Sequence, residues 1–288
     1  WPEKYRPTEL SEFAGNADLL QKIDGWINNQ DVPNLIFYSE KSGTGKTTLC
    51  KLIAKKLDAD VKYINASSEN SIDVVRETVS SFAMTQSFSK WKIIILDEFS
   101  YFTKNAQSAL LSIIENTSAT TRFFLTGNYI DKFLPAIVSR CHPFLIQSPP
   151  PKKIFENISA ILNAESVEFN QSDLANLIKR YYPDQRALLN YCQIYSSTGK
   201  LVYNEADVIT NDYCNQVVNK LTEVKSAQSA ESIFKEIRQI IINSKDKQFD
   251  DLFRHLYDQI DIIAPAGKKA GIILFIADAQ NKAANVID

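Results

Sequence analysis

An apolar run, Leu35 to Tyr38, leads directly into a glycine-containing turn that ends in Lys46-Thr47. This arrangement is typical of a strand that enters a loop, and the residues after the loop suit a helix. Glycines let successive backbone N–H groups point at one anion, and a helix start attracts negative charge. The lysine can reach terminal phosphates and the threonine hydroxyl can ligate Mg²⁺. The pattern therefore predicts a nucleoside triphosphate site formed by Gly43, Thr44, Gly45, Lys46, Thr47 and Thr48.

Glu40 occupies the position where the strict phosphate-loop pattern has its first glycine, so a second element is needed. The run Lys92 to Leu96 is unbroken, aliphatic and β-branched, and Asp97-Glu98 follows it. Such a run predicts a buried parallel strand. Asp97 at its end can hold Mg²⁺ and Glu98 can orient or deprotonate the attacking water, although two solvated acids after a strand would look the same. Together the two elements predict an ATPase that uses ATP and Mg²⁺.

The composition restricts the class of protein. The 288 residues suit two or three domains, and the net charge of −2 means that nucleic acid would be bound by local basic groups. The sequence has four scattered cysteines and two histidines, which indicate neither a zinc site nor a disulfide framework. No apolar stretch is long enough for a membrane span, so we expect a soluble protein. The cysteine pattern favours a reducing compartment, so we expect a cytoplasmic location. Because the chain opens on Trp1, we also expect that residues precede it.

Strand and helix patterns alternate up to residue 148, which predicts an α/β domain with a three-layer, parallel-sheet architecture. The expected elements are strands 35–38, 61–64, 92–97 and 122–126 and helices 47–57, 72–84 and 105–115. The prolines at 149–151 mark a boundary. Helical periodicity then predicts a lid domain, 149–214, with helices 152–162, 171–181 and 184–196 and another opened by Asn204 and Asp207. An all-helical third domain, 215–288, is expected to contain helices 217–224, 229–242, 246–262 and 266–283, with Pro265 between the last two.

Six ordered motifs give the chain a family resemblance. It resembles the AAA+ sliding-clamp loader ATPases of the replication-factor-C type, most closely the ATPase subunit of T-even-like bacteriophages. The motifs are Glu3 to Pro7, the loop 43–48, Asn65 to Ser68 with Ile72 to Arg76, Asp97-Glu98, Thr126 to Asn128, and Ser139 to Cys141. The resemblance implies an AAA+ domain, a helical lid and a collar, the last by position and helicity alone. A bacteriophage protein of this kind would act in the infected bacterial cell.

The resemblance also assigns nucleotide roles. It places Glu3, Lys4, Tyr5 and Ala14 around the adenine. Asn128 becomes the polar sensor of the γ-phosphate, although an ordinary capping or turn residue is the alternative, because asparagine is common at such positions. Arg186 becomes the lid arginine over the phosphates, against the alternative of a solvated helical arginine. Arg140 becomes the finger inserted into a neighbouring subunit's site, where a planar guanidinium suits phosphate.

Other assignments concern regulation, DNA and the clamp. Asn70 stands where the family keeps a switch residue that holds Glu98 away from water, and a solvated loop is an equally good interpretation. The resemblance places two helix starts along the DNA template strand, with contacts from Ser71, Ile72 and Arg76 and from Lys104, Asn105 and Gln107. Taken singly, either start could be an ordinary capped helix. Met84 and Phe88 resemble the tip that faces the sliding clamp, whereas Phe82 is expected in the core.

The resulting hypothesis is an ATP-hydrolysing motor subunit that opens a sliding clamp and places it on primer-template DNA. Its implied partners are other clamp-loader subunits in a pentameric ring, the clamp and DNA. One alternative is another AAA+ DNA motor, either a branch-migration helicase or an initiator-loading ATPase. The other is a ring subunit that binds nucleotide without hydrolysing it, which the departures at Glu40 and Asn70 keep open.

Overall fold

The computed structural model describes residues 1–202, 209–223, 227–243, 250–264 and 267–285. The chain divides into two compact units, residues 1–203 and 204–288. The first holds an α/β domain and a small helical domain, and the second is helical. The finer division at 148 and 214 stays a prediction.

The α/β domain is built on a five-stranded parallel sheet in the order β2-β3-β4-β1-β5. Its strands are β1 (Leu35–Tyr38), β2 (Asp60–Asn65), β3 (Lys92–Asp97), β4 (Thr121–Gly127) and β5 (His142–Leu145). Because the strands are parallel, the segments that follow β1, β3 and β4 all emerge at the end of the sheet formed by the carboxyl ends of the strands. That end carries the candidate site.

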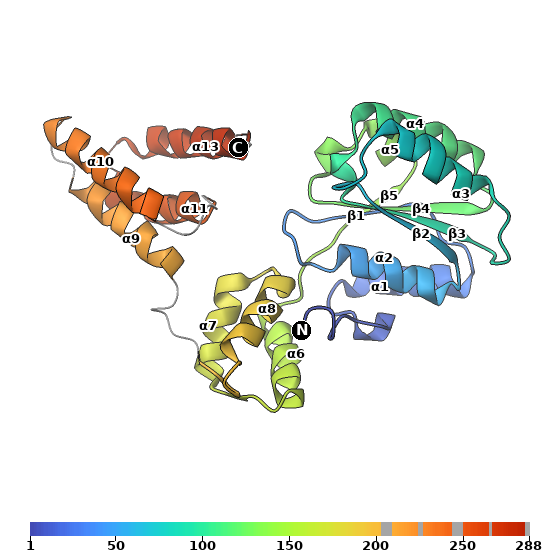
Figure 1. Ribbon diagram of the computed structural model, residues 1–288, viewed down its shortest axis with the longest axis horizontal. Helices are drawn as coiled ribbons and strands as arrows, with labels where there is room; N and C mark the ends of the chain where they lie inside the picture. The colour runs from blue at the N-terminus through green and yellow to red at the C-terminus, as the bar shows by residue number, and fades with distance from the viewer. Residues whose placement is uncertain (203–208, 224–226, 244–249, 265–266, 286–288) are drawn as a thin grey trace. The chain divides into compact units, whose positions relative to one another are not determined.

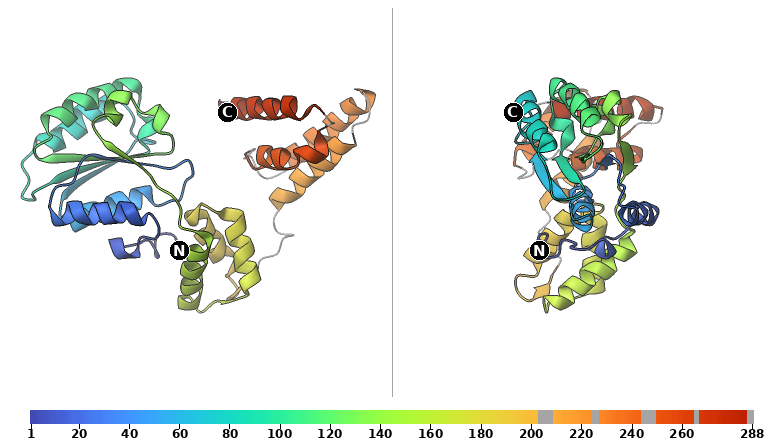
Figure 2. Two further views of the ribbon diagram at one scale, coloured as in Figure 1. Left: turned by 180° about the vertical axis from the view of Figure 1, so that it is seen from behind. Right: turned by 90° about the vertical axis from the view of Figure 1, so that its right-hand side faces the viewer.

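Helices cover both faces of the sheet (Figure 1). One face carries α1 (Ala17–Asn28) and α2 (Lys46–Lys56), and the other carries α3 (Ser80–Met84), α4 (Lys104–Asn116) and α5 (Pro135–Val138), as Figure 2 shows from behind. The buried strand β3 alternates between the two cores: Ile93 and Ile95 join the α1–α2 cluster, whereas Ile94 and Leu96 join the other. Burying each such side chain contributes about 1.5–3 kcal/mol. The expected three-layer architecture is confirmed.

The connecting segments include short helices. They are η1 (Leu10–Glu12), the π-helical η2 (Val74–Val79), η3 (Phe99–Tyr101) and η4 (Ile130–Lys132). The helix expected over 72–84 is thus wound as a π-helical segment followed by α3. The sequence analysis did not predict strand β5, because Pro143 interrupts its apolar pattern. Pro is tolerated there because β5 lies at the sheet edge and pairs only with β1.

The small helical domain follows Pro150. Its elements are α6 (Pro151–Ala164), β6 (Glu168–Phe169), α7 (Gln171–Tyr181), α8 (Gln185–Tyr195) and β7 (Lys200–Leu201), close to the expected helices. Leu162, Leu174 and Leu177 are fully buried in its core. The two-residue strands β6 and β7 were not expected, because a single bridge leaves no periodic pattern in the sequence.

The second unit contains α9 (Ile209–Thr222), α10 (Ala227–Asn243), α11 (Asp250–Asp258), α12 (Ile260–Ile263) and α13 (Lys269–Asn285). Cys214, Val217 and Leu252 form its buried core. Asn204, Asp207 and Pro265, and the start of the helix expected over 246–262, lie outside the described residues. Within the described part of the chain, no helix is both long and apolar enough to cross a membrane.

Candidate active site

The loop after β1 has the backbone that a phosphate site requires. Gly43 and Gly45 adopt φ angles of 67° and 96°, in the left-handed region that favours glycine. A Cβ added at Gly45 would lie 2.8 Å from the Phe13 ring, so the close approach also excludes a side chain. α2 begins directly after Gly45, and its first N–H groups are free of intrahelical partners. The loop therefore has the geometry that the predicted phosphate site requires, and nucleotide binding there stays a prediction.

Lys46, the first residue of α2, is 7% exposed. Its Nζ donates to the carbonyl oxygen of Lys41 at 3.2 Å and to Oδ1 of Asn128 at 2.9 Å. Burial lowers the pKa of Lys46, and the negative charges of Glu98 and Asp97 oppose that shift. Both hydrogen-bond acceptors are neutral, so the positive charge remains available to an anion. Two predicted residues from distant segments, Lys46 and Asn128, thus meet.

Asp97 ends β3 and is 8% exposed. Its Oδ1 accepts hydrogen bonds from the hydroxyls of Thr47, at 2.6 Å, and Thr126. Its Oδ2 accepts one from the Tyr63 hydroxyl at 2.7 Å. Mg²⁺ takes oxygen ligands and is commonly held by one or two protein groups together with substrate phosphates. The adjacent oxygens of Thr47 and Asp97, both predicted as metal ligands, fit that requirement.

Glu98 follows Asp97 with a φ of 53°, and its N–H donates to the Thr126 hydroxyl at 3.1 Å. Its Oε2 is buried and has no hydrogen-bond partner among the described residues. Burial raises the pKa of Glu98, against the attraction of Lys46. An unsatisfied buried acceptor costs about 1–3 kcal/mol, so it marks a group held ready for another molecule. That arrangement suits the predicted water-activating base.

A cleft of about 560 Å³ lies beside the loop, between the N-terminal segment and helices α6 and α8. Of the predicted residues, Lys4, Tyr5, Ala14, Gly43, Thr44, Gly45, Thr48 and Arg186 line it. Glu3 is not among the lining residues and pairs with Arg6 instead. The helical domain contributes a wall that the sequence patterns did not identify: Ile154, Asn157, Ile158, Ile161 and Leu189.

The N-terminal segment is attached to both sides of this cleft. Lys4 Nζ and the Tyr5 hydroxyl each donate to Oε1 of Glu165 at 2.5 Å, at the end of α6. Arg6, which was not predicted as a site residue, donates to the Thr48 hydroxyl at 2.8 Å. The hydroxyl of Thr48 therefore points to Arg6.

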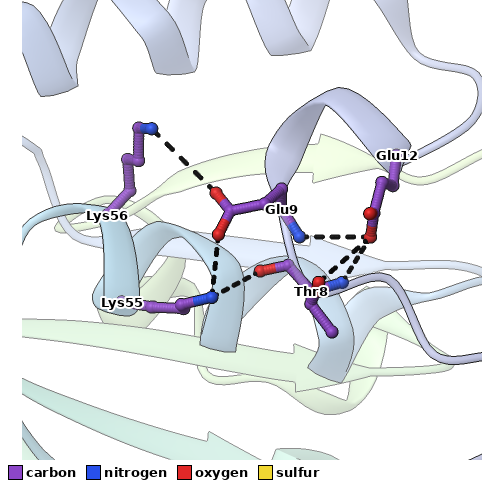
Figure 3. Close-up of polar contacts among 5 residues, drawn as sticks. All are labelled: Thr8, Glu9, Glu12, Lys55 and Lys56. Atoms are coloured by element: carbon purple, nitrogen blue, oxygen red, sulfur yellow. Dashed lines mark hydrogen bonds and ion pairs between the residues drawn. The ribbon is translucent and has the colours of Figure 1, made fainter. Parts of the chain in front are cut away.

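η1 fixes the same segment to α2 (Figure 3). Lys55 donates to the carbonyl of Thr8 at 2.9 Å and to Glu9 at 2.8 Å, and Lys56 lies 4.0 Å from Glu9. The Glu12 carboxylate accepts from the N–H of Thr8 at 2.7 Å. Because α2 begins at the phosphate loop, these contacts hold the cleft wall in register with the loop.

The helical domain contacts the loop through Asp184, the N-cap of α8. Its Oδ1 accepts from the N–H of Ala187 at 2.9 Å and its Oδ2 from the Ser42 hydroxyl at 2.5 Å. A Cβ at Gly43 would collide with Asp184. Arg186, the second residue of the same helix, is exposed and lines the cleft. The structure therefore brings the predicted lid arginine beside the loop.

Arg140 lies at the opposite end of the sheet, beside the amino ends of the strands. Its carbonyl accepts from Asn34, just before β1, and His142 pairs with Leu35 at the start of β1. The phosphate loop follows the opposite end of that strand. The Arg140 side chain is 38% exposed and forms a 2.5 Å ion pair with Glu115. Arg140 cannot serve the loop of its own chain across the sheet, which agrees with a role in a neighbouring subunit.

The predicted DNA residues separate into two groups. Ser71, Arg76, Lys104 and Asn105 are exposed, and Ser71 Oγ accepts from the Val74 N–H at 3.4 Å. Ile72 is half-buried and packs on the core.

The DNA contact expected for Gln107 is wrong in this structure. Gln107 is 1% exposed, and its amide donates to the carbonyls of Phe102 at 3.2 Å and Lys132 at 3.3 Å. Its oxygen accepts from the N–H of Leu134 at 2.9 Å. Gln107 thus joins α4 to the segment before α5, and these buried hydrogen bonds keep its side chain from the surface.

The switch and clamp residues lie on the surface. Asn70 is exposed, its carbonyl accepts from the N–H of Thr103 at 3.5 Å, and no hydrogen bond to Glu98 is formed among the described residues. Met84 is 68% exposed and Phe88 is fully exposed, so both are accessible to a partner, and the clamp contact stays a prediction. Phe82 packs against the core, also as expected.

Comparison with known proteins identifies the family. Residues 33–150 match the model of the DNA polymerase III delta subunit. Replication factor C subunit 5 of Homo sapiens is 31% identical over 251 residues, which cover 78% of this chain and 74% of the human protein. The chain belongs to the replication factor C subunit family. Replication factor C subunit 5 of Arabidopsis thaliana is 36% identical over 215 residues, covering 71% of this chain and 58% of the plant protein. The replication factor C-like chain thus spans about three-fifths to three-quarters of the length of these relatives.

An archaeal relative and a solved structure extend the comparison. Replication factor C small subunit 1 of Pyrobaculum islandicum is 32% identical over 209 residues, covering 70% of this chain and 63% of that protein. The RuvB Holliday junction branch migration motor of Thermotoga maritima superposes with a TM-score of 0.58 at 17% identity, covering 76% of this chain and 79% of that one. At that identity the likeness shows the fold alone, and it agrees with the expected α/β domain followed by helices.

Proposed function

We propose that this replication factor C family chain is an ATP-hydrolysing motor subunit of a sliding-clamp loader, which opens the clamp and places it on primer-template DNA. The observation that carries the proposal is a pair of hydrogen bonds at the carboxyl ends of the strands, from Lys46 to Asn128 and from Thr47 to Asp97. Such a constellation positions phosphates and a metal, which is most of what phosphoryl transfer requires.

Each side chain has a defined part in the proposed reaction. Lys46 and the loop N–H groups bind the phosphates, and Thr47 and Asp97 would hold Mg²⁺. Mg²⁺ held there would neutralise the negative charge that develops on the phosphates. Glu98, with its unpartnered carboxylate oxygen, orients and deprotonates the water. Asn128, fixed by Lys46, stands where it can report the terminal phosphate.

The proposed active form is a ring. Arg140 lies beside the amino ends of the strands, away from the phosphate loop of its own chain. A nucleotide site that includes Arg140 therefore requires a neighbouring subunit. The partners we propose are other clamp-loader subunits, in a pentamer, with residues 215–288 as the collar. Sliding clamp and DNA would contact the exposed groups at Met84 and Phe88 and at Arg76 and Lys104.

The alternatives are less well supported. A branch-migration motor shares the fold, but the sequence identity to that structure is 17%, against 31–36% for the replication factor C subunits above. A non-hydrolysing subunit would not need the buried, unpartnered carboxylate oxygen of Glu98. The bacteriophage affiliation and cytoplasmic location stay predictions, since the relatives reported above are plant, human and archaeal.

The test is steady-state ATP hydrolysis by the chain assembled with its partner subunits, with and without primer-template DNA and the cognate clamp. We expect DNA and clamp together to stimulate hydrolysis. A rate that neither partner changes would refute the clamp-loader assignment while leaving an ATPase, and the absence of hydrolysis in an assembly that binds ATP would favour the non-hydrolysing alternative.

A further inference from the structure

The carboxylate of Asp97 is held unequally at its two oxygens. Thr47 and Thr126 both donate to Oδ1, whereas Oδ2 accepts only from the Tyr63 hydroxyl, at 2.7 Å, among the described side chains. A terminal carboxylate torsion is broad, so the two hydroxyls on Oδ1 alone leave its plane free to turn. The bond from Tyr63 at the second oxygen fixes the carboxylate plane.

The fold places Tyr63 for this contact. On β2, Asn65 pairs with Asp97 and Tyr63 stands two residues earlier, so Tyr63 and Asn65 project from the same face. Lys51 of α2 lies with its Nζ 4.8 Å from the centre of the Tyr63 ring. The ring thus lies on the side of the sheet that α2 covers, and α2 is the helix that carries Thr47.

The chemistry of the pair is one-directional. Tyr63 is 40% exposed, and its hydroxyl reaches the carboxylate of Asp97, which is 8% exposed. A phenol O–H can donate and a carboxylate oxygen accepts, so the hydrogen bond runs from Tyr63 to Asp97.

We propose that Tyr63 is a positioning residue for the metal site: by holding Oδ2 of Asp97, it aims Oδ1 at the Thr47 hydroxyl, where Mg²⁺ bound with ATP would be held. The inference rests on the proposed nucleotide site and extends it to a residue outside the phosphate-binding motifs. Groups that orient a metal ligand typically change metal affinity or activity by about 10- to 100-fold.

The test compares Tyr63→Phe, which removes one hydroxyl, with Tyr101→Phe, which removes the hydroxyl of an exposed tyrosine of η3. The first readout is Mn²⁺ binding to the assembled protein with ADP, measured by electron paramagnetic resonance. The second is ATP affinity in excess chelator. We expect Tyr63→Phe to weaken Mn²⁺ binding at least about tenfold, with unchanged metal-free ATP affinity and an unchanged Tyr101→Phe control.

Two results would overturn the inference. One is Mn²⁺ affinity in Tyr63→Phe within twofold of wild type. The other is an equal loss of ATP affinity with and without metal, which would show that Tyr63 only supports the fold. Failure of the proposed function is a separate outcome. A wild-type assembly that binds Mn²⁺ with nucleotide but does not hydrolyse ATP would refute the motor assignment. The binding measurements would still decide the Tyr63 comparison.

Discussion

Nζ of Lys46 donates a 2.9 Å hydrogen bond to Oδ1 of Asn128, so the first residue of α2 and the residue after β4 meet although 82 positions separate them. Lys46 cannot move toward a phosphate without changing what Asn128 contacts. Occupancy of the phosphate loop is thereby linked to the strand that also carries Thr126, a hydrogen-bond donor to Asp97.

Lys46 and Glu98 should be separable by substitution. Lys46→Ala should weaken ATP binding and abolish hydrolysis, because it removes the charge that holds ground-state phosphates. Glu98→Gln should bind ATP and lose turnover, because it keeps the shape but cannot take a proton. Equilibrium nucleotide binding and single-turnover hydrolysis check both. Near wild-type turnover in Glu98→Gln would remove Glu98 from the mechanism.

Arg140→Ala should leave ATP binding by the isolated chain unchanged and slow hydrolysis by the assembly about 10³-fold or more, as expected for an arginine supplied in trans. Glu115→Gln is the matched control. It breaks the same surface ion pair, which is worth at most about 1 kcal/mol. Equal slowing in both variants would show that the ion pair, and not the finger, matters.

Glu98 should also make the free energy of unfolding depend on pH. Its folded-state pKa is raised above 4.5, so between 4.5 and the folded pKa the folded state retains a proton that the unfolded state has released. The free energy of unfolding therefore falls as pH rises through that window. Glu98→Gln should be more stable than wild type at about pH 7, and the difference should shrink toward about pH 4. Urea unfolding at each pH measures it, and a difference independent of pH would contradict the assignment.

Replacing Met84 and Phe88 together with Asp should abolish clamp-stimulated hydrolysis while DNA binding by the assembly persists. Both side chains are exposed, so the double variant should unfold at a temperature close to that of wild type. Clamp affinity in a pull-down is the direct readout. Retained affinity would place the clamp surface elsewhere.

Arg76→Ala and Lys104→Ala should each weaken primer-template binding similarly across sequences and reduce the salt slope by about one, because each removes roughly one phosphate neutralisation. Gln107→Ala is the contrasting variant. Its hydrogen bonds are buried, so it should destabilise the fold by about 1–3 kcal/mol and leave the salt slope unchanged. Fluorescence anisotropy over a salt series tests all three, and an unchanged slope in both basic variants would show that these helix starts do not meet DNA.

The sequence alone predicted the elements whose signals are local. Strands 35–38 and 92–97 were located correctly because aliphatic runs bounded by turns need no distant partner to be recognised. The loop glycines were readable for the same reason. β5 was not, since its Pro143 is acceptable only at a sheet edge, and edge position is a property of the assembled sheet.

Only the tertiary structure decided which side chains share a site and which way they face. Gln107 and Lys104 lie one turn apart on α4 and both donate to the Lys132 carbonyl oxygen, yet Gln107 is buried whereas Lys104, the first residue of the helix, is exposed. Tyr63 reads as an ordinary strand residue until β2 pairs with β3 and brings its hydroxyl to Asp97. Contacts of this kind depend on strand order and register, which no pattern within a single segment records.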